Sequence, residues 1–206
     1  LINPTNGLPL IDANFKVRGD RNPDFTLGWL NNITYKDLRI SFLWDVKVGG
    51  DIFNATERYL TTIGRSSLTK DRGVARIVPG VLRDGKENTT SPTLNNISIT
   101  PETNSLFYTT MPEEAFIEKD VNWFRLRDLT FNYNIKKLLK GDVDKFAKTL
   151  NVFLTINDLI LISNYRGADP AVGATTSASR GVSGFGFDYG NMGAPVSFNF
   201  GFRASF

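Results

Sequence analysis

The sequence contains no cysteine and no histidine. Without cysteine, disulfides and thiolate metal sites are excluded. Without histidine, the most common general base, the Ser-His-Asp triad and most zinc sites are excluded together.

The remaining candidates for chemistry are few. Asp142 and Asp144 lie close together, but the further oxygen ligands of a calcium loop are missing around them. The motif Gly184-Phe185-Gly186 lacks the third glycine and the strand-to-helix context of a nucleotide-binding loop. We therefore expect a protein that is not an enzyme and that carries no metal and no cofactor.

Long apolar runs and a large charge excess are missing as well. No stretch of about 18 apolar residues occurs, which excludes a transmembrane helix. The 24 basic and 21 acidic residues leave a net charge of +3, which is too even to indicate nucleic-acid binding. The mean hydropathy of −0.19 is typical of a soluble protein. A transmembrane β-barrel would give a similar value, because half of each strand faces a polar lumen.

The most regular pattern lies at the C-terminal end, in residues 195–206. Apolar and polar side chains alternate there, which is the period of a β-strand. The apolar face consists of Val196, Phe198, Phe200, Phe202, Ala204 and Phe206. At about eleven residues the strand is long enough to cross a bilayer, whereas soluble strands average about five or six. The pattern alone fits both an outer-membrane strand and a strand of a soluble sandwich.

Further long strands with the same alternation are predicted at residues 25–35, 38–47, 121–135 and 150–162. Their apolar faces carry Trp29, Trp44 and Phe131. We expect these side chains and Phe198 to face lipid, with the tryptophans at a bilayer interface. The alternative is that they are core aromatics of a soluble sheet.

The alternation breaks in two of these strands. One break falls at Arg127-Asp128 and the other at Asn157-Asp158. Folding the two strands about residue 142 brings both breaks to nearly the same height. We expect either a paired β-bulge or a rim position at which the lipid-facing pattern ends.

The connections between the predicted strands alternate in length. Residues 36–37 and the basic stretch 136–148 are short turns, and the second is either solvated or in contact with anionic headgroups. Residues 1–24, 49–119 and 163–194 are long segments. Outer-membrane barrels have this asymmetry, with short periplasmic turns and long extracellular loops. A compact soluble domain rarely contains so long a loop.

We therefore predict an all-β fold, the five final strands of an antiparallel transmembrane β-barrel with long extracellular loops. The odd number of strands puts the N-terminus on the long-loop side. Five strands cannot close a membrane barrel, because the smallest have about eight and lipid does not tolerate open edges. The remaining strands are expected to come from the same chain or another one. The start at Leu1, without Met or signal peptide, leaves a nick, a split gene and a partial chain open.

Several short motifs follow one another in a distinctive order. They are GDRNPDFTLG at 19–28, GGDIFN at 49–54, VNWFRLRDLT at 121–130, NDL at 157–159, YRGADP at 165–170 and FDYG at 187–190. Together with the Phe-rich final strand, these motifs resemble the C-terminal part of the SusC/RagA family. That family comprises TonB-dependent outer-membrane transporters of Bacteroidota. Two places depart from the family pattern. Asp158 replaces a Gly- or Asn-like residue, and residues 191–195 differ from the sequence that usually precedes the last strand.

The resemblance implies a barrel of about 22 strands with a plug in its lumen. Residues 1–206 would form only the C-terminal part of that barrel, and the plug and the TonB box would lie outside this chain. The family imports oligosaccharides or peptides, with a SusD-like surface lipoprotein as a lid and the TonB complex acting on the plug. The resemblance also implies that Phe206, together with Phe202 and Phe200, is a signal for barrel assembly.

Aromatic side chains in the long loop 49–119 are candidate contacts to a lid or a substrate. They are Phe53, Tyr59, Phe107 and Tyr108, with Phe116 as a further loop aromatic. The alternative is that these rings pack within the loop. A structural or docking barrel in a larger cell-surface assembly is the alternative to an importer, and a soluble sandwich or adhesin fragment is a third hypothesis.

Overall fold

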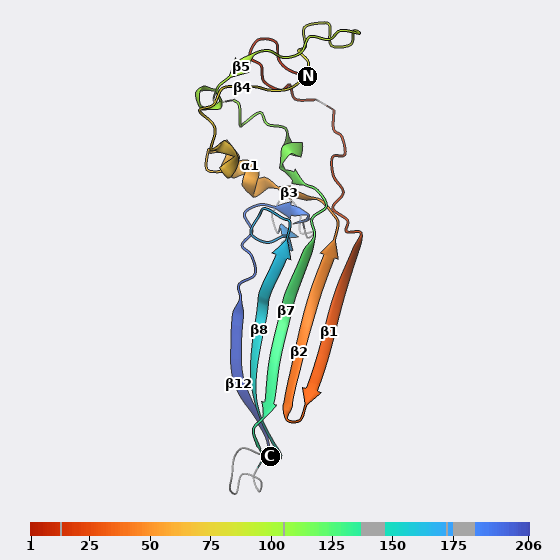
Figure 1. The fold of residues 1–206 in the computed structure, drawn as a ribbon, viewed down its shortest axis with the longest axis vertical. Coiled ribbons are helices and arrows are strands. Elements are labelled where there is room, and N and C mark those ends of the chain that lie inside the picture. Colours follow the sequence, from red (N-terminus) through yellow and green to blue (C-terminus); the bar gives the residue numbers. More distant parts are fainter. Residues whose placement is uncertain (13, 105, 137–146, 172, 175–183) are drawn as a thin grey trace.

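The computed structural model describes residues 1–12, 14–104, 106–136, 147–171, 173–174 and 184–206. Five long strands form one antiparallel sheet, and the shorter elements gather at one end of it (Figure 1). The long strands are β1 (Phe25–Tyr35), β2 (Leu38–Val48), β7 (Trp123–Asn134), β8 (Thr149–Ser163) and β12 (Ser197–Ser205). Each predicted strand is confirmed, with ends that differ by no more than about two residues.

The strands lie in the order β1-β2-β7-β8-β12, so that β1 and β12 are the edges of the sheet. Lys36 and Asp37 join β1 to β2 in a tight hairpin, as predicted. The predicted basic turn between β7 and β8 falls mainly on residues 137–146, which lie outside the described residues. The long connections are at one end of the sheet together with the N-terminus, and the C-terminus is at the other end (Figure 1). The predicted asymmetry of the connections is therefore confirmed.

One face of this sheet is apolar over almost its whole height. Because partner residues in neighbouring strands point to the same side, the register defines apolar rows across the sheet. One such row is Ile33, Ile40, Phe131, Leu154 and Phe200. The next is Asn31, Phe42, Leu129, Ile156 and Phe198, in which only the asparagine is polar. Trp29, Trp44, Phe131 and Phe198, which were predicted to share an outward face, all lie on this one face.

The opposite face is mostly polar and carries cross-strand hydrogen bonds. Thr130 and Thr155 pair through their hydroxyls at 2.8 Å, and the Asn157 amide donates to Ser197 Oγ at 3.0 Å. Phe153 is an exception on this face, and it lies over Gly201 of the neighbouring strand. A Cβ at Gly201 would come within 2.7 Å of the Phe153 ring, so the glycine makes room for it.

A paired β-bulge interrupts β7 and β8 at the same height, as one of the two sequence hypotheses stated. Leu126 pairs with Ile160 and Asp128 with Asn157, which leaves Arg127 unpaired in β7 and two residues unpaired in β8. The extra residue reverses the parity of β7, so that Leu126 joins the same face as Leu129. The apolar face therefore continues above the bulge, and the alternative of a rim position is wrong.

The loop end of the sheet contains short elements that the sequence pattern did not define. The strands are β3 (Ile52–Asn54), β4 (Arg76–Ile77), β5 (Ser98–Ile99), β6 (Ile117–Glu118), β9 (Gly173–Ala174), β10 (Gly184–Phe185) and β11 (Phe187–Asp188). The helices are α1 (Ala55–Thr62) and the 3₁₀ turns η1 (Ser67–Thr69), η2 (Pro101–Thr103) and η3 (Glu113–Phe116). Within the described part of the chain, no helix is long and apolar enough to cross a membrane.

The most distant part of the structure is a lobe made of residues 1–10 and 64–112, which we call the distal lobe (Figure 1). β4 pairs with β5 in it, and Ile2 forms bridges to Pro9 and Leu82. A cluster of buried apolar residues lies between this lobe and the long strands, and it consists of Ile52, Val121 and Tyr165. The chain therefore has its core at the loop end, whereas the long sheet leaves its apolar face exposed.

Candidate functional site: a loop cluster over the polar face

The motifs that are far apart in the sequence meet at the loop end of the long strands. β3 pairs with β6 on one side and with β11 on the other, which joins residues 49–54 to residues 117–118 and 187–188. Val121 N–H donates to Gly50 O at 2.9 Å, so the segment just before β7 is bonded to residues 49–54 as well. We call the assembly of residues 19–24, 49–58, 113–122, 164–171 and 184–194 the loop cluster.

Two glycines allow the first motif to lie directly on the second. Gly49 and Gly50 both have left-handed backbone conformations, with φ of 80° and 88°. A Cβ at Gly50 would come within 2.8 Å of Arg21 O, and one at Gly49 within 2.5 Å of the Asp24 carboxylate. The Gly49-Gly50 pair is therefore required both by the turn and by the close approach of residues 19–24.

Asp51 ties residues 19–20 to residues 119–120. Its Oδ2 accepts from Asp20 N–H at 2.9 Å and from Lys119 Nζ at 2.7 Å, and its Oδ1 accepts from Asp120 N–H at 3.2 Å. Burial alone would raise the pKa of Asp51, but the Lys119 ammonium and the two backbone N–H groups outweigh burial and hold that pKa below its ordinary value. Asp51 is therefore ionised, and the donors that bond to its side chain stabilise the carboxylate.

Asn54 links helix α1 to β6. Its Oδ1 accepts from Glu57 N–H at 2.8 Å as the N-cap of α1, and its Nδ2 donates to Glu118 at 2.8 Å. The other oxygen of Glu118 accepts from Arg166 N–H at 2.9 Å. Asn54 and Glu118 are both buried, so these bonds satisfy polar groups that have little access to water.

Asp188 is held by two side chains from different segments. Tyr165 Oη donates to one carboxylate oxygen at 2.7 Å, and Thr56 Oγ1 donates to the other at 2.8 Å. Burial and the Asp188 carboxylate raise the pKa of Tyr165, which keeps its hydroxyl as a proton donor. Asp188 is itself buried, so β11 is fixed on the cluster from both sides.

Arg125 connects the long sheet to the loop cluster. Its guanidinium pairs with Asp158 at the bulge, at 3.1 Å, and with Asp169 in the loop after β8. Burial alone would raise the pKa of Asp169, but the Ala171 N–H, Arg125 and the Ala194 N–H outweigh it and hold that pKa below its ordinary value. The Arg125 side chain is 2% exposed, so both ion pairs are shielded from solvent.

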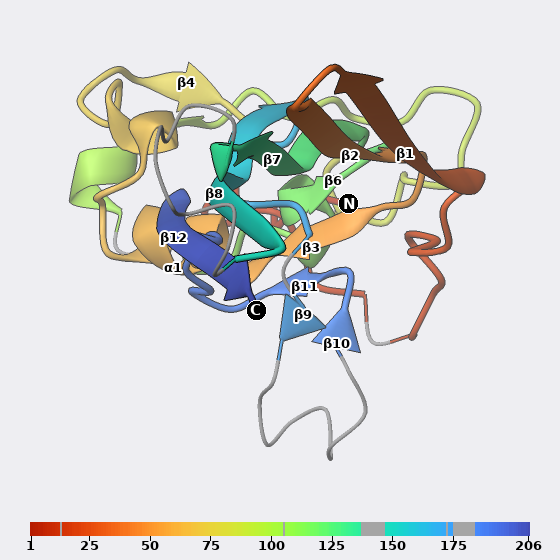
Figure 2. The ribbon, with the colours of Figure 1, turned by 90° about the horizontal axis from the view of Figure 1, so that it is seen from below.

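The loop cluster covers the polar face of the sheet. Lys47 points to that face, and its Nζ lies over the rings of its cross-strand partner Trp123, at 4.8 Å, and of Phe185, at 5.5 Å. Arg125, which holds Asp169, points to the same face. β3, β9, β10 and β11 gather on one side of the sheet when it is seen end on (Figure 2). The loops after β8 therefore fold over the polar face and leave the apolar face free.

A cavity of about 650 Å³ opens beside β3 and β11. Three aromatic rings line it, Phe53, Phe187 and Tyr189. The ring centroids of Phe187 and Tyr189 are 6.3 Å apart with the rings 17° from parallel, and both rings are 6.3 Å from the Phe53 ring at steeper angles. Cavities that hold organic ligands in proteins commonly combine such rings with a few polar groups.

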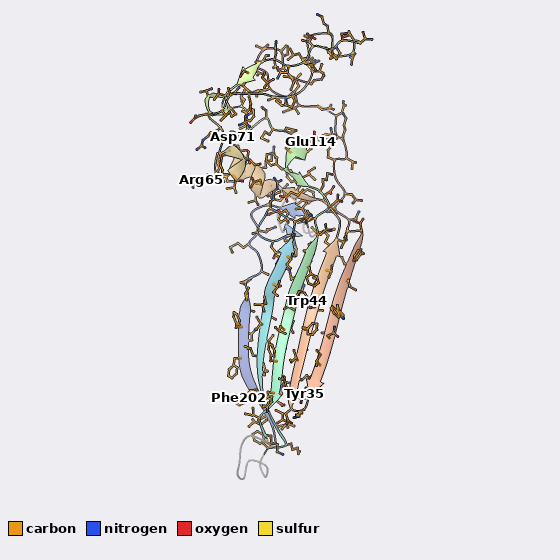
Figure 3. All side chains as sticks on the ribbon, viewed as in Figure 1. Tyr35, Trp44, Arg65, Asp71, Glu114 and Phe202 are labelled. Carbon is orange, nitrogen blue, oxygen red and sulfur yellow. The ribbon has the colours of Figure 1, made fainter. Side chains whose placement is uncertain are left out.

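Charged side chains of both signs form most of the rest of the lining. The basic residues are Lys16, Arg18, Arg21 and Arg58. The acidic residues are Asp20, Asp51, Glu113 and Glu114. Two of the arginines are paired within the cavity, Arg18 with Glu114 at 2.8 Å and Arg58 with Glu113 at 3.0 Å. Figure 3 shows Glu114 above the long strands, in the loop region.

The structure separates the aromatic residues that the sequence grouped as candidate contacts. Phe53 lines the cavity, whereas Tyr59 is exposed on α1 and is not part of the lining. Phe107 and Tyr108 pack edge to face at 5.0 Å in the segment before η3, with Arg76 over the Phe107 ring. Phe116 is fully buried, in agreement with packing inside the loop. Whether any of these rings contacts a lid or a substrate stays a prediction.

Sequence reasoning missed Phe187 and Tyr189 as cavity residues. The signal was available in the FDYG motif, because its two rings are at i and i+2 and therefore lie on the same side of an extended chain. Without the parallel pairing of β11 with β3, nothing indicated that they would meet Phe53.

The described residues contain no cluster of three or more acidic side chains that could hold a metal ion. Asp142 and Asp144 lie outside the described residues. The carboxylates of Asp51, Glu118, Asp169 and Asp188 are all bound by other groups of the structure, and their arrangement suits holding loops in place.

Sequence comparison finds relatives along almost the whole chain. The chain is 28% identical over 203 residues to TonB-dependent receptor P3 of Formosa agariphila, a match that covers 94% of this chain and 17% of the relative. It is also 28% identical over 197 residues to TonB-dependent receptor P26 of the same organism, which covers 92% of this chain and 18% of that receptor. The chain thus spans less than a fifth of the length of these relatives. No family model matches it.

Comparison of the fold finds a peptide importer. A solved structure of the RagAB peptide importer in the closed-closed state matches 90% of this chain and 17% of its own, with a TM-score of 0.54 and 18% identity. A structure of the RagAB peptide transporter matches 89% of this chain and 17% of its own, with a TM-score of 0.56 and 16% identity. These matches confirm the resemblance predicted from the sequence and, with it, the location in the outer membrane.

Proposed function

We propose that this outer-membrane chain, which resembles TonB-dependent receptors of the SusC/RagA type, forms the C-terminal part of the barrel of a nutrient importer. The importer takes up oligosaccharides or peptides, and a SusD-like surface lipoprotein covers its loops. The plug and the TonB box, on which the TonB complex acts, belong to parts of the protein outside this chain. The chain itself supplies barrel wall and extracellular loops, and no catalysis.

The observation that carries the proposal is the loop cluster. The family-like motifs occur at distant points of the sequence, yet they bind one another at the loop end of the strands and cover the polar face. In a closed barrel of about 22 strands the polar face would line the lumen. The cluster would then narrow the outer entrance of the barrel lumen, and its cavity would face molecules that approach from outside the cell.

The height of the apolar face and the position of its aromatic residues support the proposed place in the membrane. Eleven residues of β1 span about 36 Å, which at a tilt of about 40° crosses about 28 Å of membrane. Trp29 and Trp44 lie opposite each other in the upper part of the face, and Tyr35 and Tyr133 lie in the lowest row that crosses all five strands. Figure 3 shows Trp44 well above Tyr35. In the proposal Phe131 and Phe198 contact the acyl chains between these two levels.

The end of the chain fits the proposed assembly signal. Phe200, Phe202 and Phe206 are between 74% and 79% exposed on β12 and just after it, at an edge of the sheet. In the proposal the assembly machinery reads these rings before the edge strand pairs with the rest of the barrel. The outer edges of β1 and β12 would then pair with the remaining strands and leave no open backbone in lipid.

The distal lobe and α1 are the proposed surface for the lid. The lobe extends beyond the loop cluster, away from the long strands (Figure 1). Exposed apolar side chains on it, among them Val74, Ile77 and Leu106, suit contact with a partner protein. Tyr59, Phe107 and Tyr108 belong to this proposed contact surface, whereas Phe53 belongs to the cavity.

The proposal is tested by deleting the gene in its native host and comparing uptake of labelled oligosaccharides and peptides. Loss of uptake of one class, restored by the intact gene, is the expected result. A surface lipoprotein should also copurify with the intact receptor from detergent-solubilised outer membranes. Unchanged uptake of every class, with a stable complex of other surface proteins, would favour the docking-barrel function instead.

A further inference from the structure

We propose that the cavity beside β3 and β11 is a binding subsite for an uncharged sugar segment, and that Glu113 and Glu114 set its selectivity against anionic ligands. This inference rests on the proposed import function, and it assigns a class of substrate to this cavity. The argument combines the aromatic rings, the charge balance and the rigidity of the cavity.

The aromatic rings offer a flat apolar surface. The rings of Phe187 in β11 and of Tyr189 just after it are nearly parallel, and these residues are 38% and 50% exposed. A pyranose ring has an apolar C–H face and a polar rim of hydroxyl groups. Its C–H face can therefore pack on these rings while the hydroxyl groups reach the charged residues around them.

The cavity lining has equal numbers of basic and acidic residues, and two of its arginines are paired with glutamates of the same lining. Arg18 is bound to Glu114 and Arg58 to Glu113, so neither arginine offers an unopposed positive charge. A sulfated or uronate sugar would meet these carboxylates, and like charges in contact disfavour a ligand. Hydroxyl groups can accept from the arginines and donate to the glutamates without breaking either pair.

The rings are also held in place before any ligand arrives. Asp188, between the two rings, is bound by Tyr165 and Thr56, and its Oδ1 accepts from Gly190 N–H at 3.1 Å. Phe53 N–H donates to Gly186 O at 2.9 Å. A preformed surface loses little conformational entropy on binding, which favours a ligand that offers only weak individual contacts.

The first experiment measures binding by the complete receptor, purified with its lipoprotein from native outer membranes. The probes are an array of uncharged hexasaccharides, an array of sulfated and uronate hexasaccharides, and a set of hexapeptides. We expect binding of an uncharged hexasaccharide, weakened at least about tenfold in the F187A/Y189A double variant. The matched control is Met192→Ala, an exposed side chain of the same segment that is not part of the lining.

The second experiment tests the charge balance. In the E113Q/E114Q double variant both arginines lose their partners, so binding of a sulfated or uronate hexasaccharide should increase by about tenfold or more relative to the unmodified receptor. The conservative E113D/E114D variant keeps the charges and should keep the original selectivity. An equal loss of all ligands in the glutamine variant would show a structural role only and would overturn the assigned selectivity.

The outcomes separate this inference from the proposed function. Binding and uptake of peptides alone, or of charged sugars alone, overturns the inference while the receptor remains an importer. Binding of an uncharged sugar that is unaffected by F187A/Y189A also overturns it, because the ligand then binds elsewhere. Failure of the intact receptor to bind or import any probe overturns both.

Discussion

At the scale of single residues, Asn54 shows how one side chain can serve two elements. The carbonyl of its amide caps α1, and the NH₂ group satisfies the buried carboxylate of Glu118. Asparagine is the residue that offers an acceptor and a donor at this short reach. A carboxylate at this position could still cap the helix, but it would face Glu118 without a proton to donate.

We therefore expect Asn54→Asp to destabilise the loop cluster by about 1–3 kcal/mol although the N-cap is retained. Hydrogen exchange of the peptides that contain Phe53 and Val121 measures this effect, because both backbone N–H groups bond within the cluster. The control is Asn54→Ala, which loses the cap and the donor but adds no charge. An Asp variant as stable as the unmodified receptor would show that Glu118 does not depend on Asn54.

Two carboxylates of the loop cluster predict a loss of stability in acid. The pKa values of Asp51 and Asp169 are both lowered in the folded state, so each stabilises the cluster at pH values above the ordinary value of about 3.9. As the pH falls through the lowered pKa values, protonation removes these contributions. We expect faster exchange in the cluster below about pH 4, after correction for the intrinsic rate, and little change from pH 7 to pH 5. A cluster that tightens on acidification would contradict the assigned charge states.

At the scale of elements, the paired bulge determines which side chains face outward. Without the extra residue in β7, Leu126 would point to the polar face and Arg127 to the apolar one. With it, Arg127 bonds to Asp45 at 2.7 Å on the polar side. Asp158 has a left-handed φ of 52°, a conformation that glycine and asparagine adopt readily, which agrees with the Gly- or Asn-like residue that the resemblance leads one to expect there.

Asp158→Ala should therefore destabilise the bulge through two effects, the loss of the bond to Arg125 and the strain of alanine at a left-handed φ. Together they cost about 2–4 kcal/mol. Asp158→Asn retains a polar partner for Arg125 and tolerates this φ, so its cost should be clearly smaller. Urea titration of the detergent-solubilised receptor, followed by tryptophan fluorescence, compares the two variants. Equal midpoints for both would show that neither the charge nor the backbone conformation matters.

The long strands and the bulge were predictable from the sequence, because period-two alternation over about ten residues is a local signal and a break in it is visible. The loop cluster was not, since β3, β6 and β11 are only two or three residues long and depend on partners more than 60 positions away. Helix α1 had a local signal in Asn54 and Glu57, the ends of a capping box. The cavity was only partly anticipated: Phe53 was named, but its partners Phe187 and Tyr189 were not.

At the scale of the whole molecule, the exposed apolar face is the part of the sheet that we propose to be covered by lipid. Phe200 lies in the middle of that face, in one row with Phe131 and Leu154. We expect Phe200→Asp to impair assembly, because a charge on the lipid face costs about 2–4 kcal/mol for Arg or Lys at mid-bilayer and somewhat less for Asp. The yield of heat-modifiable barrel in outer membranes measures the effect.

The matched control is Asn199→Asp, which places the same charge one residue away on the polar face. This variant should assemble normally. If both variants assembled equally well, the assignment of the apolar face to lipid would be wrong.

The larger part of the distal lobe, which follows α1 in the chain, is joined to the rest of the molecule at one narrow base, and residues 1–10 reach β1 along a second connection (Figure 1). The chain leaves α1 and returns at η3, and Arg58 of α1 bonds to Glu113, the first residue of η3, at 3.0 Å. The roughly fifty residues between these points thus form a long loop whose two ends lie close together. Because the strands β4 and β5 of this segment pair only with each other and not with the long strands, we expect that the segment can be replaced without altering the register of the long strands. Such a replacement would change the surface that is exposed to antibodies, while the five long strands would stay the same.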